Sequence, residues 1–148
     1  MTKASDPTMA FEFPIRIYWE DTDAGGIVFY ANYLKYFERA RTEWLRHRGQ
    51  AQQALKDQHG AMFVVTECQL RYLRPARLDD TLEVTVQCIE TGRASLLLRQ
   101  QTWKTQPGIE GGKELLCEGT VRIGWVDAHS MRPSRLPASV LASLDLNC

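Results

Sequence analysis

The spacing of apolar residues divides the chain into a helical part and a strand-rich part. In residues 33–45 apolar side chains recur every three or four positions, which is typical of one face of a helix. These residues are Tyr33, Phe37, Ala40 and Trp44, with Leu34 and Leu45 widening the face. The pattern predicts one long amphipathic helix that stops near Gly49, and a short helix over residues 51–58 closed by Gly60.

After Gly60 the apolar residues alternate with polar ones, which is typical of strands. Four runs rich in β-branched and aromatic residues are predicted strands: residues 62–73, 81–90, 94–104 and 114–126. A fifth precedes the helix, where Ile15 and Ile17 alternate with Arg16 and Tyr18. The short turns between the later strands favour antiparallel pairing. We therefore expect an α+β domain in which the first strand and a meander of four strands wrap one helix.

Length and charge narrow the class of protein. With 148 residues the chain suits a single domain over 1–148, whose ends, 1–10 and 142–148, we expect to be flexible. Eighteen basic and eighteen acidic side chains cancel and the arginines are scattered, so we expect neither nucleic acid nor a membrane surface as a partner. No segment resembles a signal peptide or a membrane span, which favours a cytoplasmic protein without membrane insertion.

Residues 18–33 contain the candidate chemistry. They hold a cluster of acids and glycines between the first strand and the long helix: Glu20, Asp21, Asp23, Gly25 and Gly26. Glycine permits a sharp turn, and the first backbone N–H groups of a helix are unpaired and carry partial positive charge. Such N–H groups suit a developing oxyanion, so carboxylate and oxyanion donors share one loop. Taken without further information, the acids also fit a solvated turn.

A family resemblance gives these residues roles. Residues 20–28, followed by Ala31-Asn32-Tyr33 and the helix through residues 37–43, resemble the hotdog-fold acyl-CoA thioesterases of the YbgC and 4-hydroxybenzoyl-CoA thioesterase group. The likeness continues through residues 74–80 and covers about residues 13–141, with the YbgC type closer. It implies a five-stranded antiparallel sheet wrapped around one long central helix, and hydrolysis of acyl-CoA to free acid and CoA without cofactor or metal. It also implies a homodimer whose sheets join, often as a dimer of dimers or homotetramer, with active sites at the subunit boundary.

By motif position, Asp23 matches the catalytic carboxylate of this group, and the helix start near Tyr30 matches the segment whose N–H polarises the thioester carbonyl. Gly26, Ile27 and Val28 belong to the same segment, and we expect them to contact substrate. YbgC-type members commonly carry His at the Tyr30 position, whereas the 4-hydroxybenzoyl-CoA subtype has Tyr. Because a thiolate leaves readily, a carboxylate and an oxyanion site suffice without a Ser-His-Asp triad. Attack by Asp23 to form a mixed anhydride and activation of water by Asp23 both remain open.

The resemblance also suggests where CoA binds. Arg93, Ser95 and Arg132 match positions that contact the nucleotide in the 4-hydroxybenzoyl-CoA subtype, and guanidinium groups suit its phosphates. Gly92 and Ala94 replace the basic neighbours of that subtype.

Two other functions remain open at this point. A hydratase or dehydratase would pair a histidine with a carboxylate, and residues 18–33 contain no histidine. A non-catalytic module could instead bind acyl-CoA or an acyl carrier protein. Such a module would tolerate asparagine in place of Asp23, which distinguishes it from a thioesterase. The YbgC resemblance also suggests a role in envelope lipid metabolism linked to the Tol–Pal system.

Overall fold

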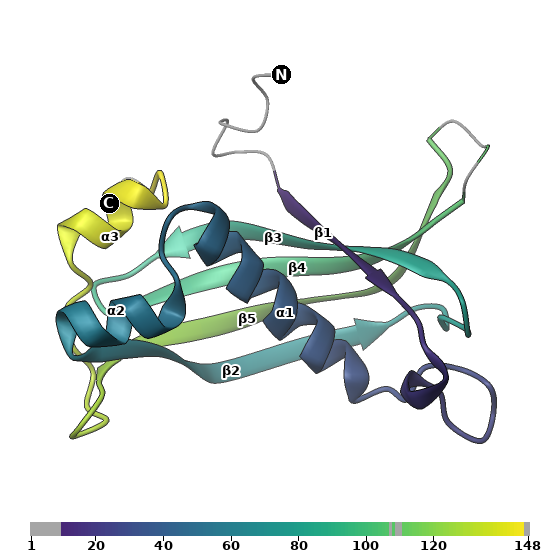
Figure 1. Ribbon diagram of the computed structural model, residues 1–148, viewed down its shortest axis with the longest axis horizontal. Coiled ribbons are helices and arrows are strands. Elements are labelled where there is room, and N and C mark those ends of the chain that lie inside the picture. Colours follow the sequence, from purple (N-terminus) through teal and green to yellow (C-terminus); the bar gives the residue numbers. More distant parts are fainter. Residues whose placement is uncertain (1–9, 107, 109–110, 147–148) are drawn as a thin grey trace.

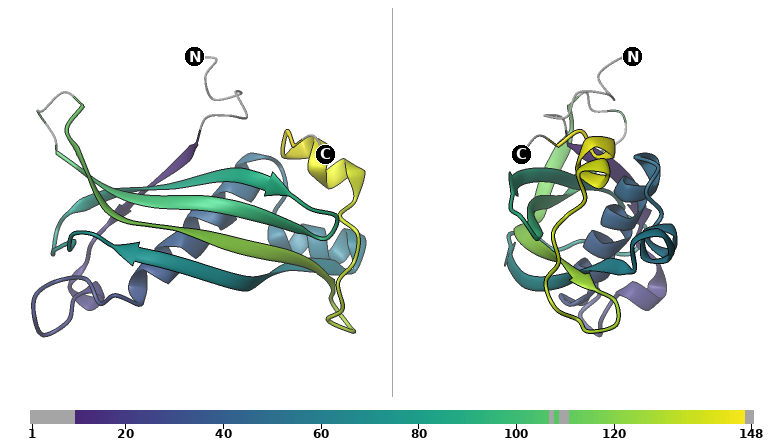
Figure 2. Two further views of the ribbon diagram at one scale, coloured as in Figure 1. Left: turned by 180° about the vertical axis from the view of Figure 1, so that it is seen from behind. Right: turned by 90° about the vertical axis from the view of Figure 1, so that its left-hand side faces the viewer.

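The computed structural model, which describes residues 10–106, 108 and 111–146, contains one antiparallel five-stranded sheet curved around a long helix (Figure 1). The strands are β1 (Phe11–Arg16), β2 (Ala61–Tyr72), β3 (Thr81–Thr91), β4 (Ser95–Thr105) and β5 (Lys113–Asp127). Their order is β1-β3-β4-β5-β2, so β1 and β2 are the two edges. The end-on view shows the sheet curling about the helix (Figure 2). The predicted α+β architecture is confirmed.

The long helix is α1 (Asn32–His47), and its buried face holds Tyr33, Tyr36, Phe37, Ala40, Trp44 and Leu45. This face packs on β3 and β1. Leu34, which the apolar pattern assigns to the same face, is 46% exposed. The shorter helices are α2 (Gln52–His59), closed by Gly60 at a φ of 64°, and α3 (Ala138–Ser143). Gly60 closes α2 as the sequence predicts, because this left-handed conformation suits glycine.

The strand order differs from a four-strand meander at one step, because β2 pairs with β5 and not with β3. Residues 73–80 connect β2 to β3 across the sheet and pass beside the start of α1, where the Ala76 N–H donates to the Tyr33 hydroxyl. The Leu73 N–H donates to Leu116 O in β5 (2.8 Å), and the Ile17 N–H, just after β1, donates to Asp80 O (2.9 Å). Midway, the Val28 N–H donates to Ala76 O (2.9 Å). The crossing therefore supports the segment that carries the acids.

The edge strand β2 is long and open. Its residues 65–69 are all exposed, with Val65 at 50%, and no strand in the described part of the chain pairs with its outer side. Backbone N–H and C=O groups on such an edge are available to another chain.

The structure describes part of each chain end. Residues 1–9 and 147–148 of the ends expected to be flexible lie outside the described residues, while Leu144 is buried and Asp145 pairs with Arg48. Within the residues that the structure describes, no helix is both long and apolar enough to cross a membrane.

Candidate active site

Asp21 fastens the acid segment to the start of α1. The 3₁₀ turn η2 (Trp19–Asp21) brings its carboxylate to the Tyr18 N–H, which donates to Oδ2 at 2.7 Å. The Asp21 carbonyl accepts from the Phe29 N–H (3.0 Å) and from Asn32 Nδ2 (2.9 Å). Side chain and backbone of Asp21 are thus both used to hold the segment in place.

Asp23 lies at the tip of the loop that follows. A bridge between Thr22 and Val28 closes the loop, and inside it the Asp23 N–H donates to Ile27 O (2.8 Å). Gly26 has a φ of 81°, a conformation that other residues adopt at a cost. The Gly25 N–H donates to Asp23 Oδ1 at 2.8 Å, and no described residue donates to Oδ2. The loop therefore presents an exposed carboxylate with one oxygen oriented and the other free.

Backbone N–H groups are unpaired where α1 begins. The Val28 and Phe29 N–H groups donate to Ala76 O and Asp21 O, and the Asn32 N–H donates to Phe29 O (2.8 Å). Between them, the N–H groups of Tyr30 and Ala31 bond to no acceptor within the described ranges. They lie at the positive end of the helix dipole, where a negatively charged oxygen is stabilised.

An apolar cavity of about 270 Å³ adjoins this helix start. Ile27, Tyr30 and Tyr33 line one side of it, and Tyr72 and Leu73, at the end of β2, line the other. The Tyr72 ring contacts the rings of Tyr30 and Tyr33 at centroid distances of 6.0 and 5.6 Å. The Tyr72 hydroxyl also donates to Tyr30 O at 3.0 Å, so β2 holds the helix start in position.

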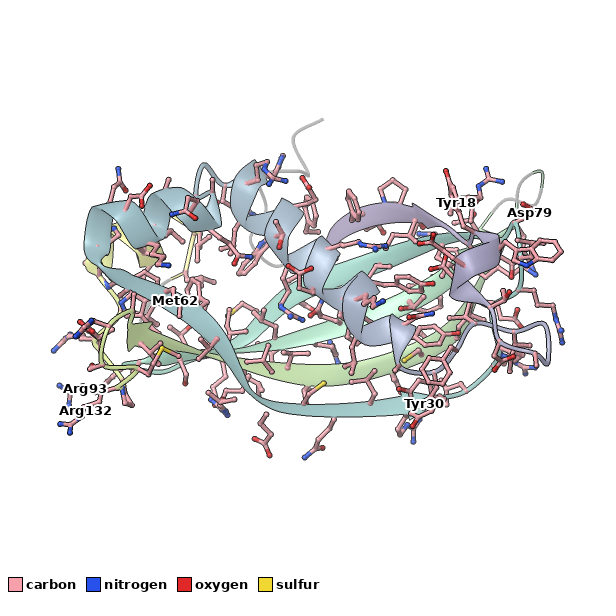
Figure 3. The ribbon with its side chains drawn as sticks, turned by 60° about the horizontal axis from the view of Figure 1, so that its bottom comes forward. Tyr18, Tyr30, Met62, Asp79, Arg93 and Arg132 are labelled. Carbon is pink, nitrogen blue, oxygen red and sulfur yellow. The ribbon has the colours of Figure 1, made fainter. Side chains whose placement is uncertain are left out.

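The residues expected to bind the nucleotide lie elsewhere. Figure 3 shows Arg93 and Arg132 at the end of the molecule opposite Tyr30. Their two segments are joined, because the Leu136 N–H donates to Arg93 O at 2.8 Å. The Ser95 hydroxyl accepts from Arg122 Nη1 at 3.1 Å. Within one chain, Asp23 and the helix start therefore lie at one end, and Arg93 and the tail lie at the other. A single chain does not place these two pairs next to each other.

Comparison with known proteins places the chain in a family. The family model of the thioesterase-like superfamily matches residues 17–144. The chain belongs to this superfamily. Among its relatives is the acyl-CoA thioester hydrolase YbgC of Escherichia coli, 42% identical over 135 residues that make up 91% of this chain and 96% of that protein. The predicted family, hotdog fold and YbgC likeness are confirmed.

Two solved structures resemble this thioesterase-like chain. A probable thioesterase from Bartonella henselae has a TM-score of 0.77 at 29% identity, covering 87% of this chain and 100% of that chain. A mutant 4-hydroxybenzoyl-CoA thioesterase in complex with 4-hydroxybenzoyl-CoA has a TM-score of 0.83, covering 91% of this chain and 98% of that chain. At 22% identity, the second likeness concerns the fold alone.

Around the thioesterase-like acid loop, burial raises the pKa of three tyrosines above its usual value of 10. Desolvation raises the pKa of Tyr33 to about 12. The hydrogen bond from the Ala76 N–H to the Tyr33 hydroxyl (3.2 Å) acts in the opposite direction and lowers this pKa. Burial likewise raises the pKa of Tyr72, and burial beside the Asp21 carboxylate raises the pKa of Tyr36. At neutral pH Tyr33 and Tyr72 therefore line the cavity as uncharged groups.

Sequence reasoning missed several residues that surround the predicted site. Tyr72 and Leu73 reach the cavity from β2, and no local motif marks them. At the opposite end, Arg135 lines a cavity of about 390 Å³ together with Arg93, and its place three residues after Arg132 was the available signal. No group of three His, Cys, Asp or Glu side chains in the described part of the chain could hold a metal ion.

Proposed function

We propose that this thioesterase hydrolyses acyl-CoA with the Asp23 carboxylate and the N–H groups of Tyr30 and Ala31. The observation that carries the proposal is their combination in one short segment: a free carboxylate oxygen and two unpaired donors at a helix start. The acyl-CoA thioester hydrolase activity named for the E. coli relative supports the same substrate class.

The chemistry follows from charge. As the thioester carbonyl becomes tetrahedral, its oxygen gains negative charge and accepts hydrogen bonds from the Tyr30 and Ala31 N–H groups. Preorganised donors of this kind contribute about 100- to 1000-fold each to turnover. Asp23 either attacks the carbonyl carbon, expelling CoA thiolate and leaving a mixed anhydride for water to cleave, or takes a proton from the attacking water. Both routes consume one water and release the acid and CoA.

A second copy of the chain completes the proposed site. The open edge of β2 suits antiparallel pairing with the same strand of a partner around a two-fold axis. In that arrangement the end of β2 that carries Tyr72 lies beside the beginning of the partner's β2. The two-chain arrangement also offers a way to supply arginines such as Arg93 and Arg132 from another chain, and two such dimers would form the expected tetramer.

The test is release of free thiol from a panel of short, medium, long-chain and aromatic acyl-CoAs. Asp23→Asn keeps the shape of the side chain and removes the carboxylate, so we expect kcat to fall at least about 100-fold on every substrate that the parent cleaves. Glu20→Gln is the matched control, because Glu20 is an exposed acid of the same segment. We expect it to retain parental activity.

Two outcomes would reject the proposal. Either no acyl-CoA is cleaved by the parent, or Asp23→Asn cleaves as fast as the parent while its circular dichroism is unchanged. In both cases a module that binds acyl-CoA or an acyl carrier protein becomes the better explanation.

A further inference from the structure

A second cavity on the helix side of the sheet carries charge. It measures about 140 Å³ and lies between α1, the first half of β2 and the start of α2. Phe63 and Val65 of β2 give it apolar walls, while Glu38 and Arg41 of α1 give it polar ones. An engineered cavity of roughly 150 Å³ holds a benzene molecule, so this space suits the end of a small acyl group.

A hydrogen bond to Gln100 of β4 holds the Arg41 side chain in this cavity. Arg41 Nη1 donates to Gln100 Oε1 at 2.9 Å. Gln100 is completely buried, and its Nε2 donates to the carbonyls of Phe37 (3.1 Å) and Thr85 (3.2 Å), so the amide cannot turn away. Helix and sheet together therefore determine where the guanidinium lies.

The charge of Arg41 has no close anionic partner in the described part of the chain. None of the ion pairs within 4.0 Å among the described residues involves Arg41. Glu38, on the same cavity wall, acts on the Arg41 charge from a greater distance, and its Oε2 accepts from the Thr42 hydroxyl at 2.8 Å. Burial lowers the pKa of Arg41, yet a guanidinium remains charged at neutral pH. Because a guanidinium has five N–H donors and one is used by Gln100, a partly buried Arg41 retains donors for an oxygen that enters the cavity.

The proposed dimer connects this cavity with the acid loop. Two-fold pairing of β2 sets the beginning of one strand, with Phe63 and Val65, beside the end of the other, with Tyr72. In such a pair the 140 Å³ cavity of one chain would adjoin the 270 Å³ cavity beside Tyr30 of its partner. An acyl group whose carbonyl lies at one helix start would extend toward the partner's Arg41.

We propose that Arg41 is a specificity-determining residue that selects acyl groups bearing an oxygen acceptor at their far end over alkyl chains of equal length. This inference rests on the proposed function and on the two-chain site. The ligand chemistry it names is a keto or carboxylate oxygen on a short acyl chain.

A matched pair of substrates tests it: 4-oxopentanoyl-CoA and pentanoyl-CoA, compared by kcat/KM. A hydrogen bond to a charged donor leads us to expect a preference of roughly tenfold or more for the oxo substrate. In Arg41→Met the preference should fall to about one while pentanoyl-CoA is still cleaved, because the aliphatic stem is kept. Arg39→Met is the control, since Arg39 is exposed on the other side of α1, and it should keep the preference.

Further measurements keep the inference separate from the proposed function. The two acyl-CoAs are titrated calorimetrically into Asp23→Asn and into Asp23→Asn with Arg41→Met. A preference in binding that Arg41→Met removes supports the inference even if no thioester is cleaved. If Arg41→Met does not fold, Arg41→Gln replaces it, because it keeps a donor for Gln100 without the charge.

The inference is overturned if the parent shows no preference in either cleavage or binding. It is also overturned if the Arg41 variants reduce both substrates equally, because Arg41 would then be a structural residue of α1 or of the dimer.

Discussion

Asp21 and Asp23 lie two positions apart, yet their carboxylates have different partners. Asp21 receives the Tyr18 N–H and lies beside the buried hydroxyl of Tyr36, so it works as part of the framework. Asp23 receives one N–H from the tight loop and is otherwise exposed. At the scale of single residues, the loop backbone decides which acid is free to act on a substrate.

The role proposed for Tyr30 belongs to its backbone. Its side chain is 63% exposed and packs edge-on against Phe29 and Tyr72, whereas its N–H is unpaired at the helix start. Tyr30→Phe keeps the ring and the N–H, so we expect kcat on the best acyl-CoA to stay within about threefold of the parent. Steady-state thiol release measures this. A loss of two orders of magnitude would show that the phenol itself takes part.

Tyr33 makes the stability of the fold sensitive to alkaline pH. Its pKa is about 12 in the folded protein and 10.0 without the fold, so between these values the folded state holds the proton more tightly. The contribution of Tyr33 to the free energy of unfolding should therefore be constant below pH 10 and should fall as pH rises from about 10 to 12. Urea unfolding at pH 8 to 11 measures the slope.

The control for this slope is Tyr33→Phe. It removes the ionising hydroxyl but also the acceptor of the Ala76 N–H, so it should lower stability at pH 8 and flatten the decline above pH 10. Tyr36 and Cys117, whose pKa values burial also raises, should leave part of the slope. An unchanged slope in Tyr33→Phe would contradict the assignment.

At the scale of elements, local patterns predicted most of the secondary structure. The predicted strand over residues 81–90 corresponds to β3 (Thr81–Thr91), and Gly49 and Gly60 end their helices as expected. The candidate loop could also be predicted from local sequence, because Asp23 and Tyr30 lie in one continuous motif. The pairing of β2 with β5 could not be predicted, because residues 73–80 suit a turn or a crossing equally well.

The parts of the site that depend on contacts between distant segments also could not be predicted from the sequence. Tyr72 approaches Tyr30 only through the sheet, and the hydrogen bond between Arg41 and Gln100 joins positions 59 residues apart. Periodicity identifies which face of an element is apolar, but not which side chain of another element it meets.

The pairing of β2 with β5 depends on Gly119. A Cβ built at this position would overlap the backbone carbonyl of Gln69 on β2, and backbone atoms cannot move aside without opening the ladder. We expect Gly119→Ala to lower the free energy of unfolding by about 2 to 4 kcal/mol, measured by chemical denaturation.

Gly124→Ala is the matched control on the same strand. Its Cβ would meet the side-chain methyl of Thr66 at 3.1 Å, and a side chain can give way, so the loss should stay below about 1 kcal/mol. If Gly119→Ala and Gly124→Ala lost equal stability, the close approach of β2 and β5 at Gly119 would not be the cause of the destabilisation.

At the scale of the whole molecule, α1 packs on β3 and β1 and α2 packs on β2, while the outer edge of β2 pairs with no strand of the described residues. Exposed apolar side chains collect near that edge, among them Leu34, Val65, Tyr72 and Leu73. Both cavities on the helix side lie here as well, one at each end of β2. An unpaired edge, exposed apolar side chains and two open cavities together favour a partner that covers all three.

A charge at the middle of β2 tests this arrangement. Cys68 is exposed near the centre of the open run of residues 65–69, so in a two-fold pair it lies close to its own copy. Cys68→Lys places two like charges near the axis, which opposes pairing of the strands. We expect a folded monomer by light scattering and circular dichroism, with kcat/KM on the best acyl-CoA reduced at least about 100-fold because the site lacks its second chain.

The control places the same charge on the other edge of the sheet. Glu12→Lys on β1 removes one ion pair of Lys113, which keeps Glu83 at 2.7 Å, so the oligomer and the activity should remain those of the parent. If Cys68→Lys stays a dimer with full activity, β2 is not the edge that joins the chains. If it becomes a monomer and keeps full activity, each chain holds a complete site, and the connection between the two cavities must be abandoned.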